Sequence, residues 1–218
     1  YTLSEAIASG TVTYTRTGGS SDPGSPHAQN LSGAEFNTGV RSLAALSSAP
    51  TLVDGATYTI DFNGVDAAGN AATQVSVTSI TFDTTVPADF TVGSVITTGG
   101  TVTAGKWNST NTDIAVTVPL ANDATLIGGT LQIQASVASG LYENLGSAHT
   151  IADGEENTSV TSSFDAATFE ALSGGISNGE SILFKAILTD KAGNAKTGTE
   201  SGTSIAFDQS VPAFSSVT

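Results

Sequence analysis

A two-part motif that occurs twice in the same order constrains this chain more than any other feature. The first part runs Asp66-Ala-Ala-Gly-Asn-Ala71 in one copy and Asp190-Lys-Ala-Gly-Asn-Ala195 in the other. The second part has the pattern Ile-x-Phe-Asp-x-x-Val-Pro, at residues 80–87 and 205–212. Equivalent residues are 124 apart in the first part and 125 apart in the second. A repeat of this length and order predicts two copies of one domain.

The residues in front of each motif alternate between apolar and polar. This period of two runs through residues 57–62 and 182–188, and it predicts strands with one face on a core. Similar alternation at residues 11–15, 114–120 and 131–137 adds further strands, and residues 165–172 suggest one helical turn. Apolar residues make up 39% of the chain and charged residues only 12%, and 24 glycines supply turns.

We therefore predict an all-β chain of two Ig-like antiparallel β-sandwiches in tandem, the first lacking its own N-terminal strand. The predicted domains are residues 1–86 and 87–211, and residues 212–218 form the first strand of a following unit or a donated strand. Pro87 and Pro212 follow the last strand of each unit, where a fixed φ suits a stiff linker.

The C-terminal segment begins a further copy of the repeat, because Phe214 matches Phe90. Two explanations are open. The chain is one period of a covalent tandem array, or the segment completes the next subunit by strand addition and builds a head-to-tail polymer. An arbitrary boundary with a frayed end is the third, bland alternative. The residues expected at the polymer contact are Tyr1, Leu3, Pro212, Ala213, Phe214 and Val217.

With these residues in view, the chain resembles the Ig-like tandem repeats of very large bacterial and archaeal cell-surface proteins and adhesins, the biofilm-associated-protein type included. The resemblance rests on the repeated Asp-x-Ala-Gly-Asn turns, the two Phe-Asp-x-x-x-Pro junctions and Leu3-Ser-Glu-Ala6. It implies an extracellular or cell-surface stalk, spacer or adhesive module, often stiffened by calcium at its junctions.

Calcium is the cofactor that this pattern predicts, because hard cations take oxygen ligands and carboxylates recur near the junctions. In the first unit the candidate ligands are Asp66, Asp83 and Glu5, and in the second Asp190, Asp208 and Asp123. The competing interpretation is that Asp66 and Asp190 cap their turns through bonds to backbone N–H groups.

The charge balance limits the partners. Twenty acidic and six basic residues give a net charge of −14, so we expect no nucleic acid partner. No apolar run is long enough for a membrane helix, so we expect no direct membrane insertion. Cysteine is absent, which leaves out disulfides and thiolate zinc sites.

We predict no catalytic role and no catalytic residues. Gly175-Ile-Ser-Asn-Gly179 matches a nucleophile elbow only in its letters, because it precedes a strand instead of turning into a helix. His27 and His149 lie in unrelated contexts and suggest neither a triad nor a zinc pair.

The leading hypothesis is a structural subunit or segment of an extracellular filament or stalk whose partners are further copies of itself. The alternative is an adhesin module that binds glycan or another cell-surface ligand through loops of the stretch 90–107. Trp107 fits better as a packing residue than as a ligand-stacking one. Candidate glycosylation sites are Asn30, Asn108 and Asn157, although such sequons also arise by coincidence in a Ser/Thr-rich chain.

Overall fold

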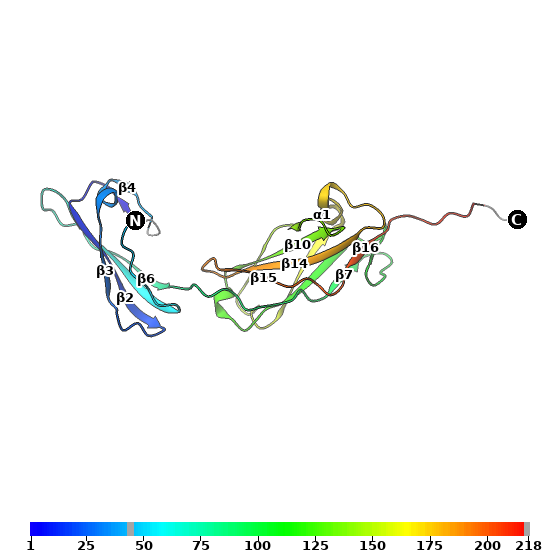
Figure 1. Ribbon diagram of the computed structural model, residues 1–218, viewed down its shortest axis with the longest axis horizontal. Helices are drawn as coiled ribbons and strands as arrows, with labels where there is room; N and C mark the ends of the chain where they lie inside the picture. The colour runs from blue at the N-terminus through cyan, green and yellow to red at the C-terminus, as the bar shows by residue number, and fades with distance from the viewer. Residues whose placement is uncertain (43–45, 216–218) are drawn as a thin grey trace. The chain divides into compact units, whose positions relative to one another are not determined.

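The computed structural model describes residues 1–42 and 46–215. The chain divides into two compact units, Tyr1–Thr85 (unit 1) and Val86–Thr218 (unit 2), a division one residue before the boundary expected from the repeat. Nearly all regular structure in both is β (Figure 1). No helix in the described ranges is long and apolar enough to cross a bilayer.

Unit 1 contains a four-stranded antiparallel sheet in the order β3-β2-β5-β6. Its strands are β2 (Ser9–Gly19), β3 (His27–Asn30), β5 (Ala56–Val65) and β6 (Val75–Thr81). A separate short pair joins β1 (Thr2–Leu3) to β4 (Gly39–Val40), and a 3-10 turn covers Gly33–Phe36.

The core of unit 1 is small, and residues of the β1 segment, the 3-10 turn and loops pack against it. It is centred on β2 and β5, whose inward side chains include Val12, Tyr14, Tyr58 and Ile60. These are the residues whose alternation predicted the strands.

Unit 2 is a two-sheet sandwich. One sheet has the order β13-β9-β7 and consists of β7 (Val95–Thr98), β9 (Asp113–Pro119) and β13 (Ser159–Asp165). The facing sheet has the main order β11-β10-β14-β16-β8, with β12 paired to β10 and β15 to β14. Its strands are β8 (Lys106–Trp107), β10 (Thr130–Val137), β11 (Glu143–Asn144), β12 (His149–Thr150), β14 (Ser181–Thr189), β15 (Ala195–Thr197) and β16 (Ile205–Phe207).

The core of unit 2 fills the space between its two sheets. Ile114, Val116 and Val118 of β9 face Ile133 of β10 and Phe184 of β14, all at most 1% exposed. The helix α1 (Ala166–Glu170) follows β13, where the helical turn was expected, and 3-10 turns cover Ala124–Leu126 and Leu172–Gly174.

Two features of the strands differ from expectation. The first strand of unit 2 is not continuous: Thr91 forms an isolated bridge with Thr199 of one sheet, and β7 then pairs with β9 of the other. Within β6, Ile80 is 40% exposed although its counterpart Ile205 is fully buried. Ser79 beside it has a φ of 61°, and the β5–β6 register shifts there, so the alternation that aims side chains at the core is broken.

Candidate functional site

The repeated Asp-x-Ala-Gly-Asn segments form the same capped turn in both units. Asp66 Oδ1 accepts bonds from the backbone N–H groups of Ala68 and Asn70, at 2.9 and 2.8 Å. Asp190 Oδ1 likewise accepts from Gly193 and Asn194, both at 2.8 Å. Each aspartate also accepts a bond from the side-chain amide of its asparagine. Gly69 and Gly193 close the turns at φ values of 89° and 100°, which favour glycine.

A second repeated contact holds the segment that leaves each unit, and we call it the junction clamp. In unit 1, Asp54 Oδ1 accepts a bond from the backbone N–H of Thr84. At the equivalent place in unit 2, Asn178 Oδ1 accepts one from the N–H of Gln209 at 2.7 Å. Bonds from Thr84 and from the hydroxyl of Thr85 lower the pKa of Asp54. Asn178 was predicted only as part of a turn before a strand, and no contact was predicted for Asp54.

In unit 2 the segment before β7 occupies the edge of the sheet. The N–H of Thr199 donates to Phe90 O at 2.9 Å, and the N–H of Val92 donates to Thr199 O at 3.1 Å. The ring of Phe90 lies against Gly198, so close that a Cβ there would overlap it. Phe90 also borders a hollow lined by Leu120, Leu126 and Leu188. Farther along this edge, β8 pairs in parallel with β16 and buries Trp107.

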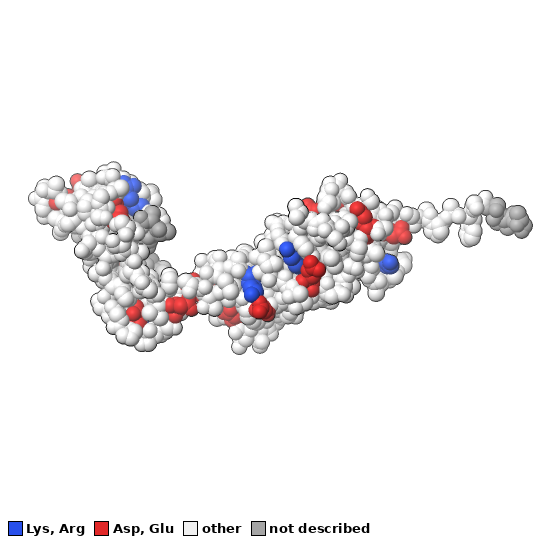
Figure 2. Space-filling model, in the orientation of Figure 1, with Lys and Arg blue, Asp and Glu red and all other residues white. Residues whose placement is uncertain are grey.

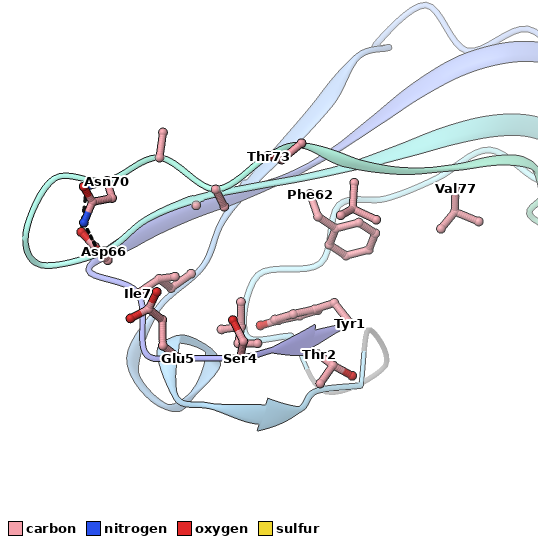
Figure 3. A pocket seen from close by; sticks show the side chains of 15 residues that line it. Tyr1, Thr2, Ser4, Glu5, Ile7, Phe62, Asp66, Asn70, Thr73 and Val77 are labelled. Carbon is pink, nitrogen blue, oxygen red and sulfur yellow. Dashed lines mark hydrogen bonds between the residues drawn. The ribbon is translucent and has the colours of Figure 1, made fainter.

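In unit 1 a cavity of about 480 Å³ lies along the corresponding edge, and we call it the edge groove (Figure 3). One wall comes from the β1 segment, with Tyr1 and Leu3, and the other from Phe62 of β5 and from Val75 and Val77 of β6. Figure 3 shows Phe62 and Val77 pointing from the sheet toward the β1 segment. Val75 and Val77 are 61% and 44% exposed.

The groove and the surroundings of Phe90 are built from equivalent positions. Leu3 ends β1 and Leu120 directly follows β9, and the repeat places Gly64 where unit 2 has Leu188. Two residues earlier, the larger side chain is in unit 1: Phe62 of β5 stands where β14 of unit 2 has Ala186. In unit 1 the Ile7 side chain lies against Gly64, at the position where unit 2 has the Leu188 side chain.

The groove has an acidic end and no basic lining residue. Glu5 and Asp66 line it, and every other lining side chain is uncharged. The side-chain amide of Asn70, helped by backbone N–H groups, lowers the pKa of Asp66, so this carboxylate stays ionised and bonded within its turn. On the face drawn in Figure 2, acidic side chains are spread over both units, and Val211–Ser215 contains no charged side chain.

The residues predicted to hold calcium are not gathered into one cluster. Across residues 1–42 and 46–215, no three His, Asp or Glu side chains come together as a metal site would require. Asp66 and Asp190 cap their turns, as the competing interpretation expected. Asp83 and Asp208 accept bonds from Thr85 N and Ser210 N, and Asp123 caps a 3-10 turn. Glu5 is exposed in the groove. Calcium binding stays a prediction.

The residues predicted at the polymer contact fall into two groups. Tyr1 and Leu3 line the edge groove. Pro212, Ala213 and Phe214 belong to an exposed segment, in which Phe214 is 98% exposed. Val217 lies outside the described residues. Sequence reasoning did not identify Val75, Val77 or Gly64, although the repeat alignment of Gly64 with Leu188 was a readable signal.

Other singled-out residues have local roles. Trp107 is fully buried, 4.7 Å from the Phe169 ring, and its Nε1 donates to Glu170 at 2.9 Å. The segment around Ser177 is a loop that leads into β14, as expected. His27 and His149 bond to Asp22 and Glu155, at 2.7 and 2.8 Å.

The three sequons differ in accessibility. Asn30 and Asn157 are exposed, whereas the side-chain amide of Asn108 donates to Thr101 O at 2.7 Å. Glycosylation at these asparagines stays a prediction.

Comparison with known proteins gives little beyond the fold. No family model matches the chain, and no curated protein matches it. Among solved structures, the chicken CNTN1 FN1-FN3 domains match with a TM-score of 0.48 and 10% sequence identity. The match covers 92% of this chain and 56% of that one, so this chain spans little more than half of its length. The resemblance to bacterial and archaeal surface repeats therefore stays a prediction.

Proposed function

We propose that this chain is a structural segment of an extracellular filament or cell-surface stalk whose sandwich units are joined head to tail. The observation that carries this proposal is the junction clamp. Asp54 and Asn178 hold the first residues beyond the last strand in the same way, so the exit from each unit is a built and repeated part of the fold. A repeated exit suits a protein that continues into another unit each time.

The alternative, an adhesin that binds a ligand through residues 90–107, has less support. Its apolar anchors pack against their own unit, since Val92, Val95 and Trp107 are at most 6% exposed, whereas residues 100–104 are exposed. A ligand-binding loop needs accessible side chains, and here the single tryptophan is inside the core. We therefore assign the buried residues of the stretch to the scaffold.

The proposed role is non-catalytic and places the chain outside the cell. Sheets occupy both units, and the loop at Ser177 leads into β14 instead of turning into a helix. The net charge of −14 keeps copies soluble and disfavours nucleic acid. Calcium is not required for the turns, because N–H donors already satisfy Asp66 and Asp190.

Negative-stain electron microscopy of the purified chain, beside a version that lacks Pro212–Thr218, tests the proposal together with a glycan array. A structural segment gives end-to-end association or uniform rods and no retention on glycans. Specific retention on one glycan class, with no end-to-end association, would establish the adhesin alternative instead.

A further inference from the structure

We infer that the edge groove of unit 1 binds the segment Val211–Ser215 from a second copy of this chain, with Phe214 seated in the groove. The inference rests on the proposed head-to-tail role and names the surface and the partner segment that perform it. Four observations support it. They are an open strand edge, an apolar groove, an exposed segment that repeats a packed one, and the lack of an acidic residue in that segment where the groove has no basic side chain.

The open edge is β6. It stands at the end of its sheet, and in the described part of unit 1 no strand pairs with its outer side. Every residue of β6 is exposed. An edge strand of this kind offers unpaired N–H and C=O groups to another chain. In unit 2 the equivalent edge is covered by Phe90–Val92 and by β8.

The groove suits one aromatic side chain beside that edge. Its apolar lining includes Leu3, Ile7, Phe62, Val75 and Val77. Strand addition combines backbone bonds along an edge with a pocket for one anchoring side chain, and both are present together in unit 1.

The matching segment is exposed at the other end of the chain. Val211-Pro-Ala-Phe214 repeats Val86-Pro-Ala-Asp-Phe90 with one residue fewer. Phe90 packs partly against the core of unit 2, whereas Phe214 is 98% and Val211 80% exposed. An aromatic side chain left this accessible, in a segment that repeats a packed one, is a ready anchor for a groove of the same design.

Charge distinguishes the two versions of this contact. In unit 2, Asp89 forms an ion pair with Lys196. The repeat places Ala72 where Lys196 stands, and the C-terminal segment has Ala213 directly before Phe214, with no acidic residue. An aspartate there would meet Glu5 and Asp66 without a cation among the lining residues. The uncharged segment Val211–Ser215 therefore fits the groove of unit 1 better than a segment with an aspartate at the position of Asp89 would.

The contact in unit 2 indicates the direction of the bound segment. Phe90–Val92 runs parallel to Thr199, which precedes the last strand. By the same pattern, Phe214 and Ser215 run parallel to the start of β6, beside Val75. The acceptor surface is in unit 1 and the donor is the exit of unit 2, so the contact is heterologous and leaves a free acceptor and a free donor for further copies.

Two variants test this by complementation in the full chain. Val75→Arg blocks the groove and leaves the C-terminal segment intact, and Phe214→Ala removes the anchor and leaves the groove intact. Both side chains are exposed, so neither change disturbs the fold. Sedimentation velocity should show concentration-dependent growth for the parent and monomers for each variant. A mixture of the two variants should form a one-to-one complex that grows no further.

The loss of the Phe214 ring should weaken association by about tenfold to a hundredfold. Thr78→Arg, on the opposite face of the same strand, is the matched control and should associate like the parent. A parent that stays monomeric, a Val75→Arg chain that still assembles, or a mixture that stays monomeric would each overturn the inference.

A charge swap tests the register. Ala213→Asp should weaken association several-fold, and Ala72→Lys in the acceptor should restore part of it by recreating the Asp89–Lys196 pair. Unchanged association in Ala213→Asp would refute this register. End-to-end assembly that survives Val75→Arg would be consistent with the proposed function and would refute only the binding of Val211–Ser215 in the edge groove. Glycan retention without assembly would refute both the proposed structural role and the edge-groove contact.

Discussion

The last strands of the two units carry a related sequence in different surroundings. In unit 2, Ile205 and Phe207 of β16 are at most 4% exposed, because β8 lies beside them and Trp107 packs nearby. In unit 1, Ile80 of β6 is 40% exposed, and no described strand of that unit covers its outer edge. The same apolar pattern therefore yields a buried or an exposed strand according to its neighbours.

The comparison also separates what each unit uses for stability. Unit 2 has a continuous core between two sheets, centred on residues such as Trp107 and Phe184. Unit 1 has fewer core side chains, and its buried hydrogen-bonded polar groups include Asp22 and Glu35, each 8% exposed. The changes below perturb one unit at a time, beginning with the largest expected effect.

Replacing Trp107 by Ala should destabilise unit 2 by about 3–5 kcal/mol, because the side chain is fully buried and the change leaves a cavity. It also removes the bond to Glu170. Calorimetry should show one unfolding transition moving to lower temperature while the other stays.

Ile80→Ala in unit 1 is the contrasting control. It should cost about 1 kcal/mol or less, because Ile80 is already 40% exposed. Equal shifts from the two substitutions would show that burial of the last strand does not differ between the units.

Replacing Tyr58 by Phe should destabilise unit 1 by about 1–3 kcal/mol, because it deletes a buried bond to an ionised carboxylate. The Tyr58 hydroxyl donates to Asp22 Oδ2 at 2.7 Å and accepts from the N–H of Val53 at 3.0 Å. Denaturant unfolding followed by circular dichroism measures the loss.

The same contact predicts acid sensitivity. The bond from Tyr58 lowers the pKa of Asp22, so Asp22 stabilises unit 1 above the unfolded-state pKa of about 4, and this stability is lost as the pH falls through the folded-state value. Glu35, Asp54 and Asp66 of unit 1 also have lowered pKa values. Below about pH 4, unit 1 should lose stability, and Tyr58→Phe should weaken the pH dependence. An unchanged acid transition in Tyr58→Phe would contradict this explanation.

Replacing Asp54 by Ala should loosen the exit from unit 1 without unfolding it. The backbone N–H of Thr84 loses its acceptor, so its hydrogen exchange should accelerate by roughly tenfold. Asn178→Ala should do the same to the N–H of Gln209 in unit 2. Acceleration in only one unit would show that the two clamps are not equivalent.

The smallest effect is expected from Lys196→Ala. Its partner Asp89 is largely exposed, so the ion pair should change the stability of unit 2 by less than about 0.5 kcal/mol. A larger loss would mean that this pair fixes the first segment of unit 2, and that its absence from unit 1 matters for more than specificity.

The sequence predicted the strands best where alternation and burial coincide. The alternation in residues 57–62 and 182–188 became β5 and β14, and the repeated turns appeared as capped turns. Ile80 was harder to place, because the register shift at Ser79 leaves no mark in the apolar pattern. The split of the first strand of unit 2 could not be predicted either. The chain passes there from pairing with Thr199 to pairing with β9 of the other sheet, and this depends on which strand edges are free to pair.

The candidate site was only half visible in the sequence. Phe214 could be recognised because it repeats Phe90. The groove could not, because Tyr1, Phe62 and Val77 are far apart in sequence and meet only through the pairing of β5 with β6 and the return of the β1 segment. Spatial neighbours of this kind follow from topology, and alternation alone does not fix topology.

The parallel contacts at the edge of unit 2 have a mechanical consequence. The chain enters through Phe90–Val92, which runs parallel to Thr199, and leaves through β16, which runs parallel to β8 on one side and antiparallel to β14 on the other. Tension applied to the two ends slides these strands along each other. The bonds at Phe90, Val92, Ala206 and Asp208 are then strained together and resist in parallel, whereas a hairpin pulled open at its free end loses its bonds one by one.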